Sequence, residues 1–142
     1  MPLLPTSGPI LKGDKLKYKI LVLDRSAPAL NQALVSMLSK EGFRVITYSG
    51  HPEALLRLGE LELDLIILGE GLPVDSFDAC WQLRQAVDIP IVMLGKVPRA
   101  TGWVKAVENG ADCYLVKPFH YSEVVARIKA ILRRRDWSLV EG

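Results

Sequence analysis

Charged and small residues follow four short apolar runs in this 142-residue chain, and their side chains mark where chemistry could occur. They are Asp24-Arg25, Gly69-Glu70, Gly95-Lys96 and Lys117-Pro118. Carboxylates can hold Mg²⁺ together with phosphate and water, whereas a carboxylate beside a lysine can also form a purely structural ion pair. We favour the structural pair for Asp24 and Lys117, with Arg25 either joining it or pointing to solvent.

The runs that precede these residues have the composition of parallel strands that are buried on both faces. They are aliphatic, do not alternate cleanly, and span residues 19–23, 44–48, 65–68, 89–94 and 114–116. Apolar residues at helical spacing predict one helix between the first two runs and others over residues 52–61, 76–86, 100–109 and 122–135. This alternation predicts an α/β fold, a flavodoxin-like doubly wound sheet of five parallel strands in the order 2-1-3-4-5 with five helices. Sites in such folds lie at the carboxyl ends of the strands.

Length and composition limit the protein to one globular domain of about residues 18–135. Residues 1–17 are expected to form a tail, and residues 136–142 the C-terminal end or the start of a linker to an output domain missing from this chain. The net charge of +2 is too small to indicate a nucleic-acid surface, and no run of 18 apolar residues could span a membrane. We expect a cytoplasmic protein in which Cys80 and Cys113 are buried free thiols.

The order of the segments resembles the receiver domain of two-component response regulators, the CheY-like family. The resemblance covers about residues 18–135 and is most specific at Gly110-Ala-Asp-Cys-Tyr-Leu-Val-Lys-Pro-Phe119. Further matching stretches are Lys19-Ile-Leu-Val-Leu-Asp24, Asp64-Leu-Ile-Ile-Leu68 with Leu72-Pro73, and Ile89-Pro-Ile-Val-Met-Leu94. The resemblance implies that an aspartate after the third strand is phosphorylated and that acidic residues after the first strand hold Mg²⁺. It also implies a hydroxyl residue after the fourth strand and a lysine after the fifth strand.

The sequence departs from this pattern at three of the five pocket positions. Asp24 and Lys117 match the family, whereas Arg25 replaces the second acidic residue, Gly69 the phosphoacceptor and Gly95 the hydroxyl residue. Gly69 supplies no nucleophile, so the covalent step has no acceptor atom there. Asp24, Arg25 and Lys117 together carry two positive charges and one negative charge, which disfavours Mg²⁺. We therefore expect no catalytic residue, no metal and no other cofactor.

Other residues near the pocket have expected positions as well. Glu70 comes one residue after the acceptor position, and a shift by one residue turns a strand side chain to the other face, so we expect a solvated loop carboxylate. Tyr114 matches the aromatic residue that moves between inward and outward positions in the family. Lys117-Pro118 resembles a motif whose peptide bond is cis. Gly102, within residues 100–109, should cost the helix about 1 kcal/mol relative to alanine.

A closer resemblance is to the OmpR/PhoB subfamily, which dimerises through the fourth helix, fifth strand and fifth helix of the fold. Glu108 and Lys129 match one intermolecular ion pair completely. Glu123 keeps half of another pair, whose partner position is Trp103, and Arg127 half of a third, whose partner position is Cys113. The alternative is that these six residues are ordinary surface and core. We expect a homodimer or another protein partner at this face, and DNA contact only through an output domain absent from this chain.

The leading interpretation is a phosphorylation-independent receiver, a regulatory interaction module with no enzymatic step that controls an attached or partner transcription factor. Two alternatives stay open. One is a conventional phosphoacceptor that uses a non-standard residue. The other is a flavodoxin-like binder of a small ligand, although the chain lacks a glycine-rich phosphate loop after its first strand.

Overall fold

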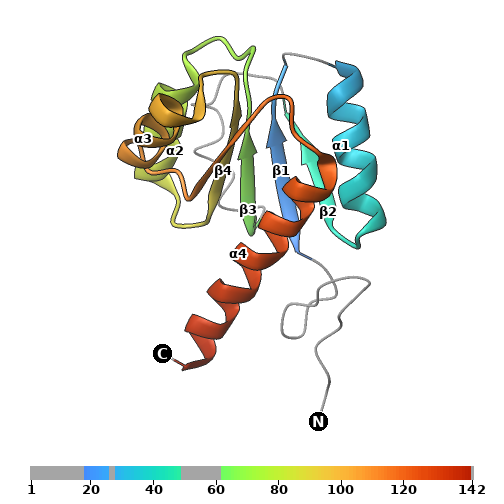
Figure 1. The fold of residues 1–142 in the computed structure, drawn as a ribbon. Coiled ribbons are helices and arrows are strands. Elements are labelled where there is room, and N and C mark those ends of the chain that lie inside the picture. Colours follow the sequence, from blue (N-terminus) through green and yellow to red (C-terminus); the bar gives the residue numbers. More distant parts are fainter. Residues whose placement is uncertain (1–17, 26–27, 49–61, 142) are drawn as a thin grey trace.

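The computed structural model describes residues 18–25, 28–48 and 62–141 and shows five strands and four helices in them (Figure 1). The strands are β1 (Lys19–Leu23), β2 (Arg44–Thr47), β3 (Leu65–Leu68), β4 (Ile91–Gly95) and β5 (Cys113–Val116). The helices are α1 (Pro28–Lys40), α2 (Ser76–Ala86), α3 (Arg99–Glu108) and α4 (Tyr121–Glu141). The predicted tail 1–17 and the predicted helix 52–61 lie outside the described residues.

The five strands form one parallel sheet in the order β2-β1-β3-β4-β5, which confirms the predicted fold class and strand order. The main difference from prediction is at β4, which begins at Ile91 and not at residue 89. Pro90 has no N–H to donate to a ladder, and its carbonyl instead accepts from the Ile66 amide at 2.9 Å. The strand therefore starts just after the proline.

Helices cover both faces of the sheet, as a parallel sheet requires. In Figure 1, α4 crosses in front of the sheet beside α1, while α2 and α3 lie together on the other side. Side chains alternate between these two cores: Ile20 and Val22 pack toward α1 and α4, whereas Leu21 and Leu23 pack toward α2 and α3. This alternation buries every strand residue of β1 except the half-buried Lys19.

Helix α2 begins where the sequence predicts and is tied to the end of β3. The Asp75 carboxylate caps the helix by accepting from the amides of Phe77 and Asp78 at 2.8 and 3.2 Å. The Ser76 hydroxyl donates to the Gly69 carbonyl at 2.7 Å. The start of this helix is thereby fixed against the strand end that carries the predicted site.

Helix α4 is longer than predicted and continues through the segment expected to be a chain end or linker. It runs to Glu141 and not to residue 135, because no glycine or proline interrupts residues 122–141. Its last turns extend past the lower edge of the sheet in Figure 1. The Tyr18 hydroxyl bonds Asp136, and Arg135 donates to the Asp88 carbonyl at 3.0 Å. None of the described helices is long and apolar enough to cross a membrane.

The two cysteines are free and buried, as expected. Cys80 lies in the core under α2, where burial raises the pKa of its thiol to about 11 despite the nearby charge of Arg84. Such a thiol stays protonated at neutral pH and behaves as a small apolar side chain.

Candidate functional site

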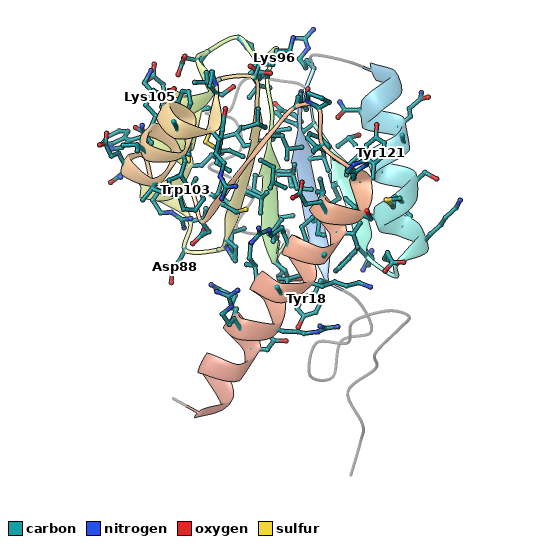
Figure 2. The ribbon with its side chains drawn as sticks, in the orientation of Figure 1. Tyr18, Asp88, Lys96, Trp103, Lys105 and Tyr121 are labelled. Carbon is teal, nitrogen blue, oxygen red and sulfur yellow. The ribbon has the colours of Figure 1, made fainter. Side chains whose placement is uncertain are left out.

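The carboxyl ends of four strands bring the predicted pocket residues to one edge of the sheet. Asp24 follows β1, Gly69 follows β3, Gly95 ends β4 and Lys117 follows β5. The parallel register aligns these ends, since Leu23 pairs with Leu68 and Gly95 with Val116. In Figure 2, Lys96, which follows β4, marks this edge of the sheet, and Asp88, which precedes β4, marks the opposite edge.

Asp24 and Lys117 form the predicted ion pair. Lys117 Nζ lies 3.1 Å from Asp24 Oδ2, and the side chains are 13% and 6% exposed respectively. Asn31 of α1 donates to the Asp24 backbone carbonyl, which fixes the residue that carries the carboxylate. Because both charges are shielded from water, each offsets part of the free-energy cost of removing the other from water.

The Asp24 carboxylate also fills the space that Gly69 leaves empty. A Cβ atom added to Gly69 would overlap Asp24 Oδ2 and lie 2.6 Å from Asp24 Cβ. The Gly69 amide donates to the Leu23 carbonyl at 2.6 Å, so the two strand ends are held close together. The backbone at position 69 therefore presents no side chain, and the place where one would begin is occupied by a carboxylate engaged with Lys117.

Glu70 lies in the pocket, and the expectation of a solvated loop carboxylate is wrong. Its Oε1 atom is 3.8 Å from Lys117 Nζ and is buried without a hydrogen-bond partner among the described residues. β3 ends at Leu68, so the strand alternation that was expected to turn Glu70 away does not extend to it. The Glu70 carbonyl accepts from the Arg25 amide at 2.8 Å, which anchors the turn. Sequence reasoning placed the end of this strand correctly but applied strand alternation to Glu70, which lies beyond that end.

The pocket residues do not fit a divalent cation. Asp24 is committed to Lys117, the Arg25 side chain is exposed, and no cluster of three His, Cys, Asp or Glu side chains occurs in the described part of the chain. A lysine ammonium group within 4 Å of both Asp24 and Glu70 occupies the position of strongest attraction for a cation. No step through Mg²⁺ follows from this arrangement.

Tyr114 lies inward, in a slot formed by two glycines. It is 3% exposed, its hydroxyl donates to the Val97 carbonyl at 2.8 Å, and its ring stacks on Phe77 with centroids 6.3 Å apart. A Cβ on Gly95 would lie 2.6 Å from Tyr114 Oη, and one on Gly102 would lie 2.6 Å from Tyr114 Cε2. Burial and then the charge of Glu70 raise the pKa of Tyr114.

Gly102 is a residue of this site that the sequence treats only as a weak point of a helix. It lies in α3, where a glycine costs helix stability, but its missing side chain admits the Tyr114 ring. The place of Gly102 in the sequence does not indicate this contact, because the Tyr114 ring and Gly102 are brought together by the packing of α3 on β5.

The residues expected at a dimer face divide into two groups. Trp103 of α3, Cys113 of β5, and Glu123 and Arg127 of α4 line one groove. Cys113 itself is buried. The groove does not include the other expected pair: Glu108 is exposed on α3, and Lys129 forms an ion pair with Glu41 of the same chain.

Comparison with known proteins gives a consistent result. The family model described as "Response regulator receiver domain" matches residues 20–129. The DNA-binding response regulator MtrA of Mycobacterium tuberculosis is 39% identical over 124 residues, which is 87% of this chain and 54% of MtrA. A probable transcriptional regulator, ycf27, of Pyropia yezoensis is also 39% identical, over 87% of this chain and 51% of its own length. The chain thus spans about half the length of these relatives.

Solved structures show the same likeness. A two-component response regulator from Clostridium difficile superposes with a TM-score of 0.75 and 29% identity, covering 84% of this chain and 98% of that one. The BeF3-activated receiver domain of Klebsiella pneumoniae RstA gives a TM-score of 0.72 and 25% identity, covering 81% and 98%. With the fold, the strand order and the family match in agreement, the chain belongs to the family of response regulator receiver domains.

Proposed function

We propose that this receiver works without phosphorylation, as a regulatory interaction module with no enzymatic step of its own. The observation that carries the proposal is the state of the strand-end pocket. Gly69 offers no oxygen nucleophile, and the Asp24 carboxylate lies where a side chain at that position would begin. Phosphoryl transfer needs an acceptor atom, and the described backbone holds none at this position.

The charges around the pocket support the same conclusion. Lys117 is paired with Asp24 and lies near Glu70, so the lysine neutralises carboxylates of the chain itself. A phosphodonor would have to displace these contacts, and the pocket lacks the carboxylate excess that holds Mg²⁺ beside a phosphoryl group.

The position of Tyr114 supports a module that does not switch. Its ring is held by Phe77, by the Val97 carbonyl and by the absence of side chains at Gly95 and Gly102. Gly95 has no hydroxyl group that could respond to a phosphoryl group. The population of this packed state can then be raised only by a partner that binds it more tightly than it binds other states of the domain.

The relatives suggest what such a module controls. MtrA and ycf27 are named as a DNA-binding response regulator and a probable transcriptional regulator, and the region matched by this chain is 54% of the first and 51% of the second. We infer that the module acts on a transcription factor, either attached or separate. Contact with DNA would come through a further domain, and protein contact through the face made by α3, β5 and α4.

One observation keeps a second candidate function open. Glu70 Oε1 lies 3.8 Å from Lys117 Nζ and accepts no hydrogen bond from a described residue, so this carboxylate is the available non-standard acceptor. A conventional phosphoacceptor receiver would then use Glu70 in place of an aspartate.

Intact-mass analysis after incubation with acetyl phosphate and Mg²⁺ separates the two functions. We expect the wild-type mass to stay unchanged while a receiver with the usual aspartate, treated in the same tube, gains one phosphoryl group. A stoichiometric gain on this chain would contradict the proposal. If Glu70→Gln abolished that gain, the acceptor would be Glu70.

A further inference from the structure

We infer that the cavity between α1 and the end of β2 binds a small aromatic carboxylate. The inference goes beyond the proposed function, because it assigns a site for a small molecule and does not depend on whether the chain accepts a phosphoryl group. It rests on the size of the cavity, on its apolar base and on the arginine in its lining.

The cavity lies at the β2 side of the sheet, away from the face made by α3, β5 and α4. β2 is the first strand in the sheet order, and among the described strands it pairs only with β1. Figure 1 shows α1 at this side of the molecule, away from α2 and α3. The cavity encloses about 690 Å³, which lies within the range of roughly 300–1,000 Å³ usual for small-ligand pockets.

The apolar base of the cavity comes from both strands and from the helix. Val22 of β1 is buried and pairs in register with Thr47 at the end of β2. The Tyr48 amide donates to the Val22 carbonyl at 3.1 Å, which holds the residue after β2 against the same part of β1. Val35 of α1 is half-buried and also lines the cavity. Val22, Val35 and Tyr48 therefore give the apolar body of a ligand a surface to pack on.

Polar side chains surround this base. Gln32 and Ser36 of α1 are exposed and lie four residues apart, so they share one face of the helix. Thr47 of β2 is exposed as well. Within the described ranges, no hydrogen bond is found for the side chains of these three residues. They can therefore bond the polar groups of a ligand without first giving up a contact there.

Arg25 sets the charge of the cavity. Asp24 also lines it, but its carboxylate is paired with Lys117 at 3.1 Å. The Arg25 amide donates to the Glu70 carbonyl at 2.8 Å, which fixes the backbone, while the side chain is exposed. No ion pair is found for the Arg25 guanidinium group in the described part of the chain. The described lining thus presents a cation that none of the described carboxylates offsets.

These features select the ligand by its chemistry. A guanidinium group binds a planar carboxylate through two parallel hydrogen bonds, and the apolar base can take up an aromatic ring beside it. A nucleotide fits less well, because the chain has no glycine-rich loop after β1 and the described lining offers a single arginine to its phosphates. A metal ion is disfavoured, since Asp24 is the only carboxylate in the described lining and is engaged with Lys117.

NMR titration of the full ¹⁵N-labelled chain tests the inference. The probes are benzoate and phenylpropionate, and the controls are their neutral amides, benzamide and phenylpropionamide. We expect each carboxylate at millimolar concentration to cause saturable shifts of the Arg25, Asn31 and Tyr48 amides. Each neutral amide should bind about tenfold more weakly, because it cannot form the charged pair with Arg25.

Two variants separate the contribution of the charge from that of the apolar base. Arg25→Gln should weaken binding of the carboxylates about tenfold and leave binding of the neutral amides unchanged. Val35→Phe should fill the cavity and weaken both kinds of probe, and its amide spectrum reports whether the variant is folded. Arg44→Gln is the matched control, because Arg44 is exposed at the opposite end of β2 and lies outside the cavity lining.

Four results would overturn the inference. They are no saturable shift with either carboxylate, equal affinity for carboxylates and neutral amides, unchanged carboxylate affinity in Arg25→Gln, and an equal loss in Arg44→Gln. The intact-mass test is independent of all four. A phosphoryl gain with probe binding intact rejects phosphorylation independence alone, whereas an unchanged mass without probe binding rejects the ligand site alone.

Discussion

Two neighbouring strands, β3 and β4, meet the pocket at glycines, and each missing side chain is replaced in a different way. At Gly69 the space is taken by the Asp24 carboxylate, which is held by Lys117. At Gly95 it is taken by the Tyr114 ring, which is also admitted by Gly102 and packed on Phe77. The first replacement is a largely buried ion pair at the carboxyl end of the sheet, and the second is aromatic packing in the core.

The difference indicates which end of the pocket fixes the state of the domain. The Asp24 carboxylate is a short side chain at the end of the sheet, and rotation about its Cα–Cβ bond can relieve a clash with a new side chain at position 69. A buried ring that stacks on a neighbour and fills a slot has no such freedom, because interiors are closely packed. We therefore expect substitutions at the β4 end to have larger effects than substitutions at the β3 end.

Tyr114→Ala should have the largest effect. Removing a buried aromatic side chain costs about 3–5 kcal/mol, from lost burial and from the cavity left behind. Denaturant unfolding should show this loss, whereas Tyr114→Phe should lose only about 1 kcal/mol with the hydrogen bond to the Val97 carbonyl. Equal small losses in both variants would mean that the ring does not fill the slot.

Gly95→Thr should come next. Its Cβ would lie 2.6 Å from Tyr114 Oη, and overpacking of this kind costs about 1–3 kcal/mol. The cost should largely disappear in the Tyr114→Ala background, which a double-mutant cycle measures. Lys96→Thr, at the exposed neighbouring position, is the control and should be nearly neutral. Additive effects of Gly95→Thr and Tyr114→Ala would contradict the slot.

Gly69→Asp should have a smaller effect. The new side chain would overlap Asp24 and add a like charge. Rotation of Asp24 relieves the overlap with its carboxylate and leaves the 2.6 Å approach to its Cβ, so we expect a loss of about 1 kcal/mol. Asp24→Ala should restore the stability of this variant. A loss greater than that of Gly95→Thr would reverse the comparison between the two strand ends.

The smallest effect concerns alkaline pH and links the two ends through Glu70. Burial and the Glu70 charge raise the pKa of Tyr114 above its ordinary value of 10.0. The folded state therefore holds its phenolic proton longer than the unfolded state. The stability from this group is complete below the unfolded pKa and is lost as pH rises through the folded pKa. Tyr114→Phe should remove this part of the alkaline loss in unfolding measurements, and Glu70→Gln should reduce it. An unchanged pH dependence in both variants would exclude the coupling.

Sequence reasoning predicted the sheet order because buried parallel strands leave continuous apolar runs such as residues 65–68. It also predicted the Asp24–Lys117 pair, since aligned strand ends bring these side chains together. It misplaced Glu70, because the residue follows the strand end, and the direction of a side chain in a turn does not follow from strand alternation. It gave no hint that Gly102 contacts Tyr114, because that contact depends on how α3 packs on β5 and not on local spacing.

We propose that this receiver is held in one state without a phosphoryl group. NMR spectra with labelled tyrosine, recorded with and without acetyl phosphate and Mg²⁺, test it most directly. We predict one set of Tyr114 ring signals, unchanged by the phosphodonor, with nuclear Overhauser contacts from the ring to the α protons of Gly95 and Gly102. A second set of Tyr114 signals that lacks these contacts and gains or loses population with acetyl phosphate would contradict the claim.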